Sequence, residues 1–201
     1  MGTRNLTCAV IDKQYKVAQY GQWDGYPSGQ GITILRFLRN ELKRPLMEKR
    51  LREVQFLNEK EIELINESKE PMPQQFSRDC GGHILEFIQN GEYTKDELDF
   101  EGLRSVRKPV TYKWEMDKLH NQLDFAGDSV FCEWAYVVDF DENTFEIYEG
   151  FVKEPHEGER FSNVDYEKSH REEQYYPVKL VKKYDLDDLP TEEEFLQELE
   201  N

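Results

Sequence analysis

The stretch from Gln19 to Gly31 constrains the fold most, because glycine and aromatic residues gather there between a strand-like and a helix-like segment. It reads Gln-Tyr-Gly-Gln-Trp-Asp-Gly-Tyr-Pro-Ser-Gly-Gln-Gly and holds four glycines, one proline and three aromatic residues. Such a backbone can adopt turn and left-handed conformations while large flat side chains project from it. Binding loops are often built in this way, so the stretch predicts a strand-to-helix loop that can contact a ligand or a partner.

The segments on both sides of this stretch support that placement. Residues 5–11 and 15–20 are rich in β-forming residues and are joined by a short polar connection, which predicts a β-hairpin. After the stretch, apolar residues recur at helical spacing and the helix is expected to end before Pro45. These apolar residues are Ile32, Leu35, Leu38 and Leu42.

Further helices are predicted in the first half of the chain. Residues 46–57 repeat the helical spacing, and residues 58–65 open with a capping box, Asn-Glu-Lys-Glu. Two prolines break the segment 68–79, which is therefore expected to be a loop. Residues 79–91 follow with an acidic start and a terminal glycine, which indicates another helix.

The second half of the chain favours strands. Between residues 92 and 128 the signals are weak: residues 94–97 could cap a helical turn, and residues 106–114 could form a strand. The segments 130–140 and 144–151 flank a polar turn and predict a second hairpin, whose second arm alternates so that one face is covered.

The last forty-odd residues begin with a polar segment, 153–174, which is expected to be an exposed and mobile loop. Residues 176–184 predict a further strand at an edge of the sheet, since Pro177 stands near its start. The capping box Thr191-Glu-Glu-Glu194 predicts a short acidic helix over 191–200.

These elements predict an α+β fold over a single domain, 1–201. An antiparallel sheet from the two hairpins plus extra strands is expected to be packed by a helical segment at 32–90. A β-hairpin at the N-terminus is also how the folds of N-terminal-nucleophile hydrolases begin, so a related fold without the nucleophile is a further possibility.

Composition bounds the cellular setting. No apolar run approaches the roughly 18 residues of a membrane span, and the first residues lack the apolar core of a secretory signal. The three cysteines, Cys8, Cys80 and Cys132, are odd in number and widely spaced, which is typical of reduced thiols. We therefore expect a cytoplasmic protein that does not contact membranes.

Charge is strongly negative and unevenly distributed. The net charge is −16, which argues against direct binding to nucleic acids. Residues 1–52 hold 10 Lys and Arg against 4 Asp and Glu, a balance of +6, so the remaining residues carry −22. The glycine-rich stretch lies in the basic part of the chain, where a local site for a small anion is physically feasible.

Three pieces of the sequence carry a resemblance: Met1-Gly-Thr-Arg-Asn-Leu-Thr7, the stretch from Gln19 to Gly31, and Trp134-Ala-Tyr-Val-Val-Asp-Phe-Asp141 with Phe145 to Phe151. In these pieces the chain resembles a family of small proteins found chiefly in phages and prophages. The resemblance implies a phage or prophage origin and the cytoplasm of a host cell. No established activity comes with it.

The candidate binding residues come from the glycine-rich stretch and the helix that follows: Trp23, Asp24, Tyr26, Gly29, Gly31 and Arg36. Backbone amides at the two glycines could meet a phosphate at the helix start, with the arginine one turn further on. Neither the phosphate-binding loop nor the dinucleotide-binding glycine spacing occurs in the chain. The alternative is a turn that is packed by its own Trp23 and Tyr26.

No catalytic signature stands out. An N-terminal-nucleophile hydrolase needs Cys, Ser or Thr as its first residue, whereas removal of Met1 exposes Gly2 and leaves Thr3 one position too late. Cys8 is expected to be buried in a strand. An enzyme is the less favoured class, and no catalytic residue is assigned.

No metal or cofactor is expected. Cys80-x-x-His83, with Asp79 beside it, has a zinc-like spacing, but it has no second Cys/His pair, although His156 and His170 could complete a site. A helix start with an incidental Cys and His is the favoured interpretation. Asp139 and Asp141 resemble paired carboxylates, yet aspartates at turns usually make local hydrogen bonds.

The sequence leads to one main hypothesis and two alternatives. The main one is an acidic, phage-encoded interaction protein that binds and modulates a host protein, for instance a defence factor, through charge complementarity. The first alternative is a protein that binds a small anionic ligand such as a nucleotide with the glycine-rich loop. The second is a hydrolase of N-terminal-nucleophile-like fold.

Overall fold

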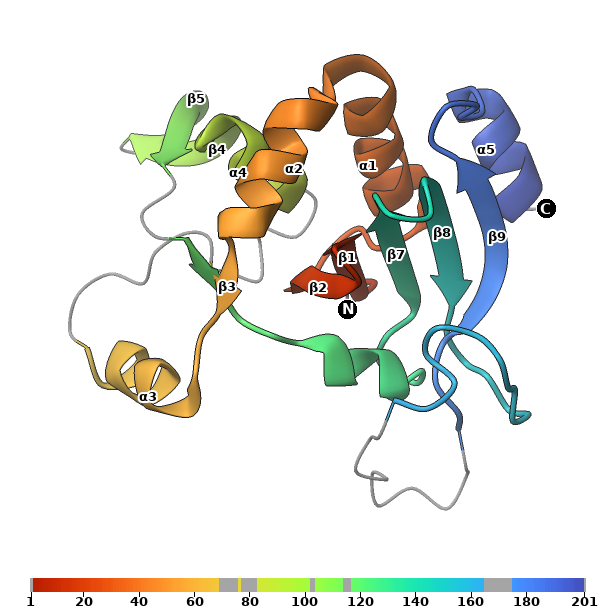
Figure 1. Cartoon of the computed structure of the whole chain (residues 1–201). Coiled ribbons are helices and arrows are strands. Elements are labelled where there is room, and N and C mark those ends of the chain that lie inside the picture. The colour runs from red at the N-terminus through yellow and green to blue at the C-terminus, as the bar shows by residue number, and fades with distance from the viewer. Residues whose placement is uncertain are drawn as a thin grey trace.

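The computed structural model describes residues 2–68, 76, 83–101, 104–113, 117–164 and 175–200. Its centre is a five-stranded sheet with the strand order β2-β1-β7-β8-β9 (Figure 1). The strands are β1 (Asn5–Ile11), β2 (Gln14–Gly21), β7 (Trp134–Asp139), β8 (Thr144–Glu149) and β9 (Lys179–Asp185). Helices and this sheet together confirm the predicted α+β class, and β9 lies at the predicted edge.

Both predicted hairpins are present, and they meet at the centre of the sheet. β1 pairs antiparallel with β2, and β7 pairs antiparallel with β8, which in turn pairs antiparallel with β9. β1 and β7 run parallel, with Asn5 opposite Trp134. The sheet is therefore mostly antiparallel with one parallel junction, and the long connection that parallel neighbours require is supplied by the helical half of the chain.

The two hairpin turns are tied to each other by aspartate side chains. Asp12 and Lys13 form the first turn with φ angles of 53° and 58°, the left-handed pair that a tight hairpin turn needs. Their N–H groups donate to the Asp141 carboxylate at 3.0 and 2.7 Å. Asp139 accepts from the N–H groups of Asp141 and Glu142, both at 3.0 Å, so these aspartates make the local hydrogen bonds that turns favour.

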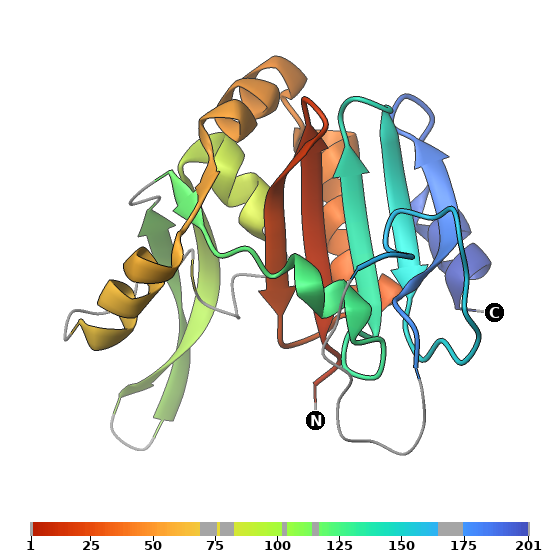
Figure 2. The same ribbon diagram turned by 60° about the horizontal axis from the view of Figure 1, so that its bottom comes forward.

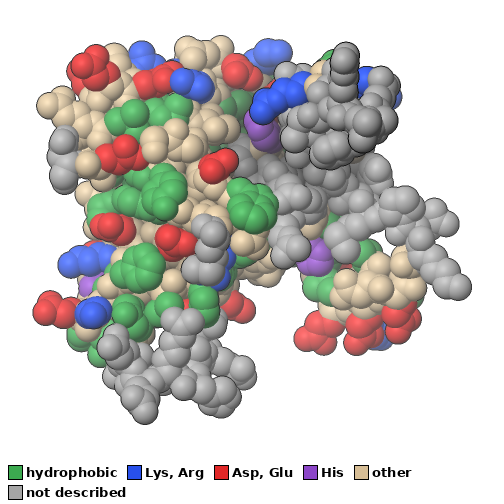
Figure 3. Space-filling model, turned by 180° about the vertical axis from the view of Figure 1, so that it is seen from behind, with side chains coloured by type: hydrophobic (Ala, Val, Ile, Leu, Met, Phe, Trp, Pro, Cys, Tyr) green, Lys and Arg blue, Asp and Glu red, His purple; other side chains and the backbone are tan. Residues whose placement is uncertain are grey.

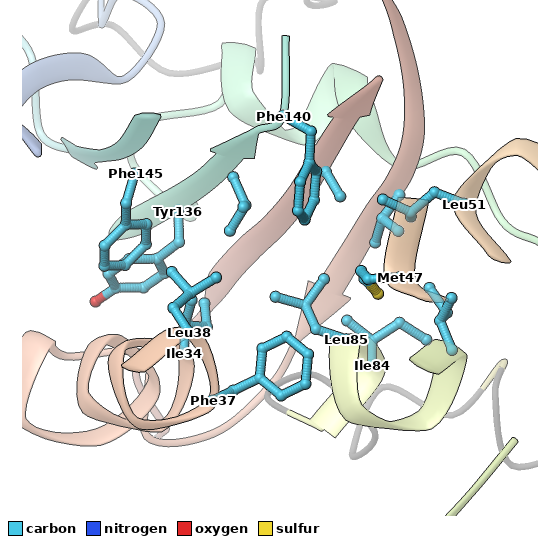
Figure 4. Close-up of a cluster of buried hydrophobic side chains, with 14 of the residues drawn as sticks. Ile34, Phe37, Leu38, Met47, Leu51, Ile84, Leu85, Tyr136, Phe140 and Phe145 are labelled. Carbon is cyan, nitrogen blue, oxygen red and sulfur yellow. The ribbon is translucent and has the colours of Figure 1, made fainter. Parts of the chain in front are cut away.

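Helices cover one face of the sheet, and they bury the larger of two hydrophobic clusters (Figures 2 and 4). A helical segment over 27–41 contains α1 (Ile32–Arg36), and it is followed by α2 (Arg44–Glu53), α4 (Ile84–Asn90) and α5 (Glu192–Leu199). Figure 4 shows side chains from α1, α2 and α4 pointing toward aromatic residues of the sheet. The labelled residues are Ile34, Phe37, Leu38, Met47, Leu51, Ile84, Leu85, Tyr136, Phe140 and Phe145.

The first helix begins five residues earlier than its apolar spacing predicts. Pro27 to Gly31 already form a π-type helical turn, and Pro27 stands in its first positions, where a missing N–H costs nothing. The stretch from Gln19 to Gly31 is therefore a loop only over residues 22–26. Phe37 to Glu41 form a second π-type turn, and the helical segment ends before Pro45 as predicted.

The other face of the sheet is covered by irregular segments, which corrects the prediction of an exposed loop over 153–174 only around Phe161, since most of the residues 153–158 are exposed. A 3-10 turn at Leu123–Gly127 and residues 150–164 cross this face (Figure 2). Phe161 is fully buried there, 4.7 Å in ring-centroid distance from Tyr148. The strand β8 is therefore covered on both faces rather than one, while residues 165–174 lie outside the described residues.

Smaller elements lie beside β2 (Figures 1 and 2). β3 (Gln55–Phe56) pairs with β6 (Lys118–Leu119), so the helix expected through residue 57 ends at Glu53. α3 (Glu59–Glu67) starts with the predicted capping box at Asn58 and Glu61. Most of the predicted loop at 68–79 lies outside the described residues.

Residues 92–113 form a hairpin that the sequence only half predicts. β5 (Arg104–Lys113) agrees with the predicted strand, whereas β4 (Glu92–Glu101) replaces the helical turn expected at 94–97. The Thr94 and Thr111 hydroxyl oxygens are 2.6 Å apart across the two strands. The cross-strand partner of Thr94 lies 17 positions later, outside the four residues of a capping pattern, so that pattern could not reveal the strand.

The helix predicted over 79–91 is observed as α4, which begins at Ile84, and residues 77–82 lie outside the described residues. Gly91 ends it with a φ of 76°, the left-handed conformation expected of a glycine stop. α5 opens with the predicted capping box at Thr191 and Glu194. None of the described helices combines the length and the apolar character that a membrane crossing requires.

Candidate functional site

The loop at residues 22–26 is held firmly by its own backbone and by the sheet. The Gly25 N–H donates to the Thr3 carbonyl at 3.0 Å, and the Gln30 N–H donates to the Asp24 carbonyl at 2.7 Å. From the centre of the sheet, the buried Tyr136 hydroxyl donates to the Gly25 carbonyl at 2.8 Å. Three hydrogen bonds thus fix the backbone of Asp24 and Gly25 between a strand and a helix.

Two glycines make this close packing feasible. A Cβ atom on Gly25 would lie 2.8 Å from the Thr3 carbonyl oxygen, and one on Gly29 would lie 2.2 Å from the Asp24 carbonyl oxygen. Both distances are shorter than a carbon–oxygen contact allows. Asp24 itself has a φ of 51°, a conformation that Asp and Asn tolerate better than most residues.

A groove of about 560 Å³ opens beside this loop and the first turns of the helical segment. Its rim carries the two aromatic side chains of the loop, Trp23 at 56% and Tyr26 at 53% exposure. On the face of the molecule seen in Figure 3, exposed hydrophobic side chains alternate with acidic ones. The residues lining the groove are Trp23, Asp24, Tyr26, Ser28, Gly29, Gln30, Ile32, Thr33, Arg36 and His83.

The groove brings together five of the six residues that the sequence singles out. Gly31 is the exception, because its Cα faces the core. A Cβ atom there would lie 2.9 Å from a ring carbon of Phe195 and 3.2 Å from one of Tyr136. This glycine serves the packing of the helical segment against α5 and the sheet.

The structure does not support the prediction that backbone amides at Gly29 and Gly31 bind a phosphate, because these N–H groups already donate hydrogen bonds within the chain. The Gly29 and Gly31 N–H groups donate to the Tyr26 carbonyl at 3.0 and 3.2 Å. The Ser28 N–H donates to the Glu200 carboxylate at 3.0 Å, so a carboxylate of the chain itself occupies the start of this helical segment.

Arg36 already forms an ion pair within the chain. Its guanidinium donates to both carboxylate oxygens of Glu192 in α5, at 2.7 and 2.6 Å. The hydrogen bond with Glu192 raises the pKa of Arg36 and lowers that of Glu192. The arginine that the sequence offered to an anionic ligand therefore ties α1 to α5.

Asp24 differs from the other charged groups of the groove. Its side chain is exposed, and within the described part of the chain no Lys or Arg forms an ion pair with it. His83, the remaining titratable group of the lining, lies 3.5 Å from Glu86. Among the residues that the structure describes, the groove thus presents one carboxylate without an ion pair, between two exposed aromatic side chains.

A second polar cluster, on the other face of the sheet, was not predicted from the sequence. Arg160 lies 2.6 Å from the Asp139 carboxylate and 2.8 Å from the Glu146 carboxylate. The Tyr148 hydroxyl donates to Glu146 at 2.7 Å, and the Lys183 ammonium lies 3.3 Å from the same carboxylate. Two acids and two bases make the cluster neutral.

The pKa shifts in this cluster follow from burial and hydrogen bonding. Burial by itself raises the pKa of Glu146, but hydrogen bonds from Arg160 and Tyr148 outweigh it and bring the pKa to about 2. Burial also raises the pKa of Tyr15, to about 12, and its ring lies 5.9 Å from the Arg160 guanidinium. Every group has its partner, so the cluster is a clasp that holds residues 159–161 on the sheet.

A Ser–His–Glu group beside this clasp is also structural. The Ser162 hydroxyl and the Glu159 carboxylate lie 3.2 and 3.3 Å from the same nitrogen of His156, Nδ1. His156 Nε2 contacts the Pro177 carbonyl at 2.9 Å. A catalytic triad needs its nucleophile and its acid on opposite ring nitrogens, which this arrangement does not provide.

The residues considered for a hydrolase are enclosed. Thr3 is buried, and Cys8 is fully buried in β1 as expected. Burial raises the pKa of the Cys8 thiol far above its ordinary value, and that of Cys132 likewise, which disfavours the reactive thiolate. Neither side chain presents a nucleophile to solvent.

The zinc-like group can be followed only in part. Cys80, Asp79 and His170 lie outside the described residues, whereas His83 directly precedes α4. In the part of the chain that the structure describes, no three His, Cys, Asp or Glu side chains are grouped closely enough to hold a metal ion.

A comparison of the chain with known protein families, curated proteins and solved structures found no match. The site must therefore be interpreted from its own geometry.

Proposed function

We propose that this protein is an interaction protein, which binds its partner through the groove rimmed by Trp23 and Tyr26. The observation that carries the proposal is that both rings stand more than half exposed on a loop held by three hydrogen bonds. Binding energy at protein interfaces concentrates in a few Trp, Tyr and Arg residues. A loop that is already rigid loses little entropy when it binds.

The Trp23 and Tyr26 rings can contribute substantially to the free energy of binding. Complete burial of a large apolar side chain stabilises by about 1.5–3 kcal/mol, and roughly half of each ring is still exposed. Covering both rings therefore supplies about 2–3 kcal/mol, which corresponds to roughly 100-fold in affinity.

The proposed partner is a host protein, and the setting is the cytoplasm of a host cell. The resemblance to phage and prophage proteins motivates the host, and the balance of −22 beyond residue 52 motivates a partner with a basic surface. Binding would modulate that host component, for which a defence factor is the leading candidate. Acidic complementarity also predicts association that slows as salt screens the charges.

The competing interpretation is a turn packed by its own aromatic residues. Trp23 has part of that role, because a Cβ atom on Gly2 would lie 2.2 Å from its ring carbon Cε3. The exposed halves of both rings are what the packing role leaves unexplained. When both rings are truncated to alanine, a packing role predicts a large loss of stability, whereas a binding role predicts loss of the partner with little loss of stability.

The test is affinity purification from infected host cells with the wild type and the double variant Trp23→Ala/Tyr26→Ala, followed by mass spectrometry. We expect the double variant to lose the co-purified partner while its Tm falls by no more than about 8 °C, since each lost half-ring costs about 1 kcal/mol. Phe151→Ala is the matched control, because Phe151 is 53% exposed and lies outside the groove. A double variant that keeps the partner, or that unfolds, contradicts the proposal.

A further inference from the structure

We propose that the groove recognises a cationic side chain, Arg or Lys, of the partner protein, which the Trp23 and Tyr26 rings and the Asp24 carboxylate receive together. This inference rests on the proposed function and adds the chemistry of the contact. An aromatic face attracts a cation through its quadrupole, and an adjacent carboxylate supplies a charge-assisted hydrogen bond. The three side chains that such a site needs lie within four residues of one rigid loop.

The charges around the groove favour a cation over an anion. Arg36, the arginine among the described lining residues, is neutralised by two hydrogen bonds from its guanidinium to Glu192. His83 lies beside Glu86, and the Glu200 carboxylate already accepts from the Ser28 N–H. Asp24 is left as the charge without an ion-pair partner among the described residues, so the groove has a negative balance.

The same contacts disfavour a nucleotide or another phosphate compound. An anion would have to displace Glu200 from the Ser28 N–H or Glu192 from Arg36, and the Gly29 N–H already donates to the Tyr26 carbonyl. It would also approach the Asp24 carboxylate, and like charges repel. Binding of an anion is therefore an outcome that the test must detect.

The backbone of Asp24 permits a clean substitution. Its φ of 51° is tolerated by Asn as well as by Asp, so Asp24→Asn removes the charge and retains the size and the turn. The matched control is Glu63→Gln, which removes one exposed carboxylate on α3, an element that does not line the groove. The two variants have the same net charge and differ only in where the charge is lost.

The probes are blocked tripeptides, acetyl-Gly-X-Gly-amide, in which X is Arg, Lys, citrulline or Glu, together with AMP as a phosphate probe. Binding is followed by ¹H–¹⁵N NMR at low salt through the indole N–H signal of Trp23, which a Trp23→Phe variant assigns. We expect the Arg and Lys peptides to shift this signal saturably. Citrulline, which has nearly the shape of Arg without the charge, should bind about 10-fold to 100-fold more weakly.

The variants decide whether the carboxylate acts locally. Asp24→Asn should weaken the Arg peptide by about 10-fold or more, and Glu63→Gln by less than about 2-fold, since Glu63 lies on α3, which does not line the groove. Any one of four results overturns the inference. The two variants weaken binding equally, the Arg and citrulline peptides bind equally, the Glu peptide or AMP binds more tightly than the Arg peptide, or no peptide shifts the signal saturably.

Failure of this inference can be told apart from failure of the proposed function. If Trp23→Ala/Tyr26→Ala loses the host partner while Asp24→Asn keeps it and the Arg peptide does not bind, the groove binds its partner by other chemistry. If the double variant keeps the partner, the groove is not the interface, whatever the peptides do.

Discussion

Replacing Arg160 with methionine tests the clasp on the face of the sheet opposite the helices. The guanidinium lies within 2.6–2.8 Å of two carboxylates, Asp139 and Glu146, whose side chains are only 4% and 5% exposed. Removing one member of a buried ion pair leaves an uncompensated charge and costs about 3–5 kcal/mol. Lys183, 3.3 Å from Glu146, compensates part of it, so we expect about 3 kcal/mol. That is a large share of the roughly 5–15 kcal/mol by which domains are stable.

The depressed pKa of Glu146 makes the stability that this cluster contributes depend on pH. Burial alone raises this pKa, yet hydrogen bonds from Arg160 and Tyr148 lower it from 4.5 to about 2 in the folded protein. A carboxyl whose folded pKa is depressed stabilises the fold above its unfolded pKa, and the effect is lost as the pH falls through the folded pKa. The difference between 4.5 and about 2 corresponds to about 3 kcal/mol of unfolding free energy.

The sign of the pH dependence follows. The wild type has the full stabilising contribution of the ionised Glu146 at pH 7, roughly half of it at pH 3, and little of it at pH 2. In Arg160→Met the main cause of the depressed pKa is gone, so the difference in unfolding free energy between wild type and variant should shrink from pH 7 to pH 3.

Urea-induced unfolding at pH 7 and pH 3 measures this difference without adding salt. Asp139→Asn/Glu146→Gln/Arg160→Met is the control, because it removes the buried charges together and should recover most of the lost stability. A loss below about 1 kcal/mol at pH 7 would refute the reasoning. An equal loss at the two pH values would do so as well.

Two further substitutions address the loop and the last helix. Gly29→Ala should destabilise the protein by about 1–3 kcal/mol in urea unfolding and weaken binding to the groove, because its Cβ would meet the Asp24 carbonyl oxygen at 2.2 Å. Gly158→Ala is the control: its φ of 78° also makes alanine unfavourable, so it should lower stability without affecting binding. Thr191→Ala should cost about 1 kcal/mol by removing the cap that accepts from the Glu194 N–H of α5, whereas Thr191→Ser should cost little, and equal losses in the two variants would contradict the capping role.

The parts of the fold that could be predicted are those encoded within a few neighbouring residues. The capping boxes at Asn58 and Thr191 and the glycine stop at Gly91 are satisfied by atoms three or four residues away. The two central hairpins were predicted for the same reason, since a short polar turn joins strands that pair with each other.

Features that depend on distant pairing could not be predicted in this way. β3 pairs with β6, more than 60 residues later, so the helical spacing through residue 57 was overruled by a partner far along the chain. The capping pattern at Thr94 was overruled by a partner strand, β5, in the next hairpin. The polar segment after residue 153 was expected to be exposed because it has few aliphatic residues. One buried aromatic, Phe161, and one paired guanidinium, Arg160, were enough to bury part of it.

In the candidate site, too, the features set by neighbouring residues could be predicted and those set by distant residues could not. Glycine and aromatic composition singled out Trp23, Asp24 and Tyr26, which the structure gathers around one groove. Composition could not show that Arg36 pairs with Glu192, 156 positions later, or that Glu200 occupies the Ser28 N–H. The basic N-terminal part of the chain predicts an anion site, and the acidic residues that neutralise this site come from the other end of the chain.

The groove and the Arg160 clasp lie on opposite faces of the central sheet, and this separation makes their roles experimentally distinct. Tyr136 faces the helices and donates to the Gly25 carbonyl of the loop, whereas Asp139, three residues later in the same strand, faces the clasp. Side chains of a strand alternate between faces, so neither site shares a side chain with the other. Changes at sites without shared contacts are usually additive. Loss of the clasp should therefore lower stability without altering the groove, and loss of the Asp24 charge should alter binding without altering the pH dependence that Glu146 creates.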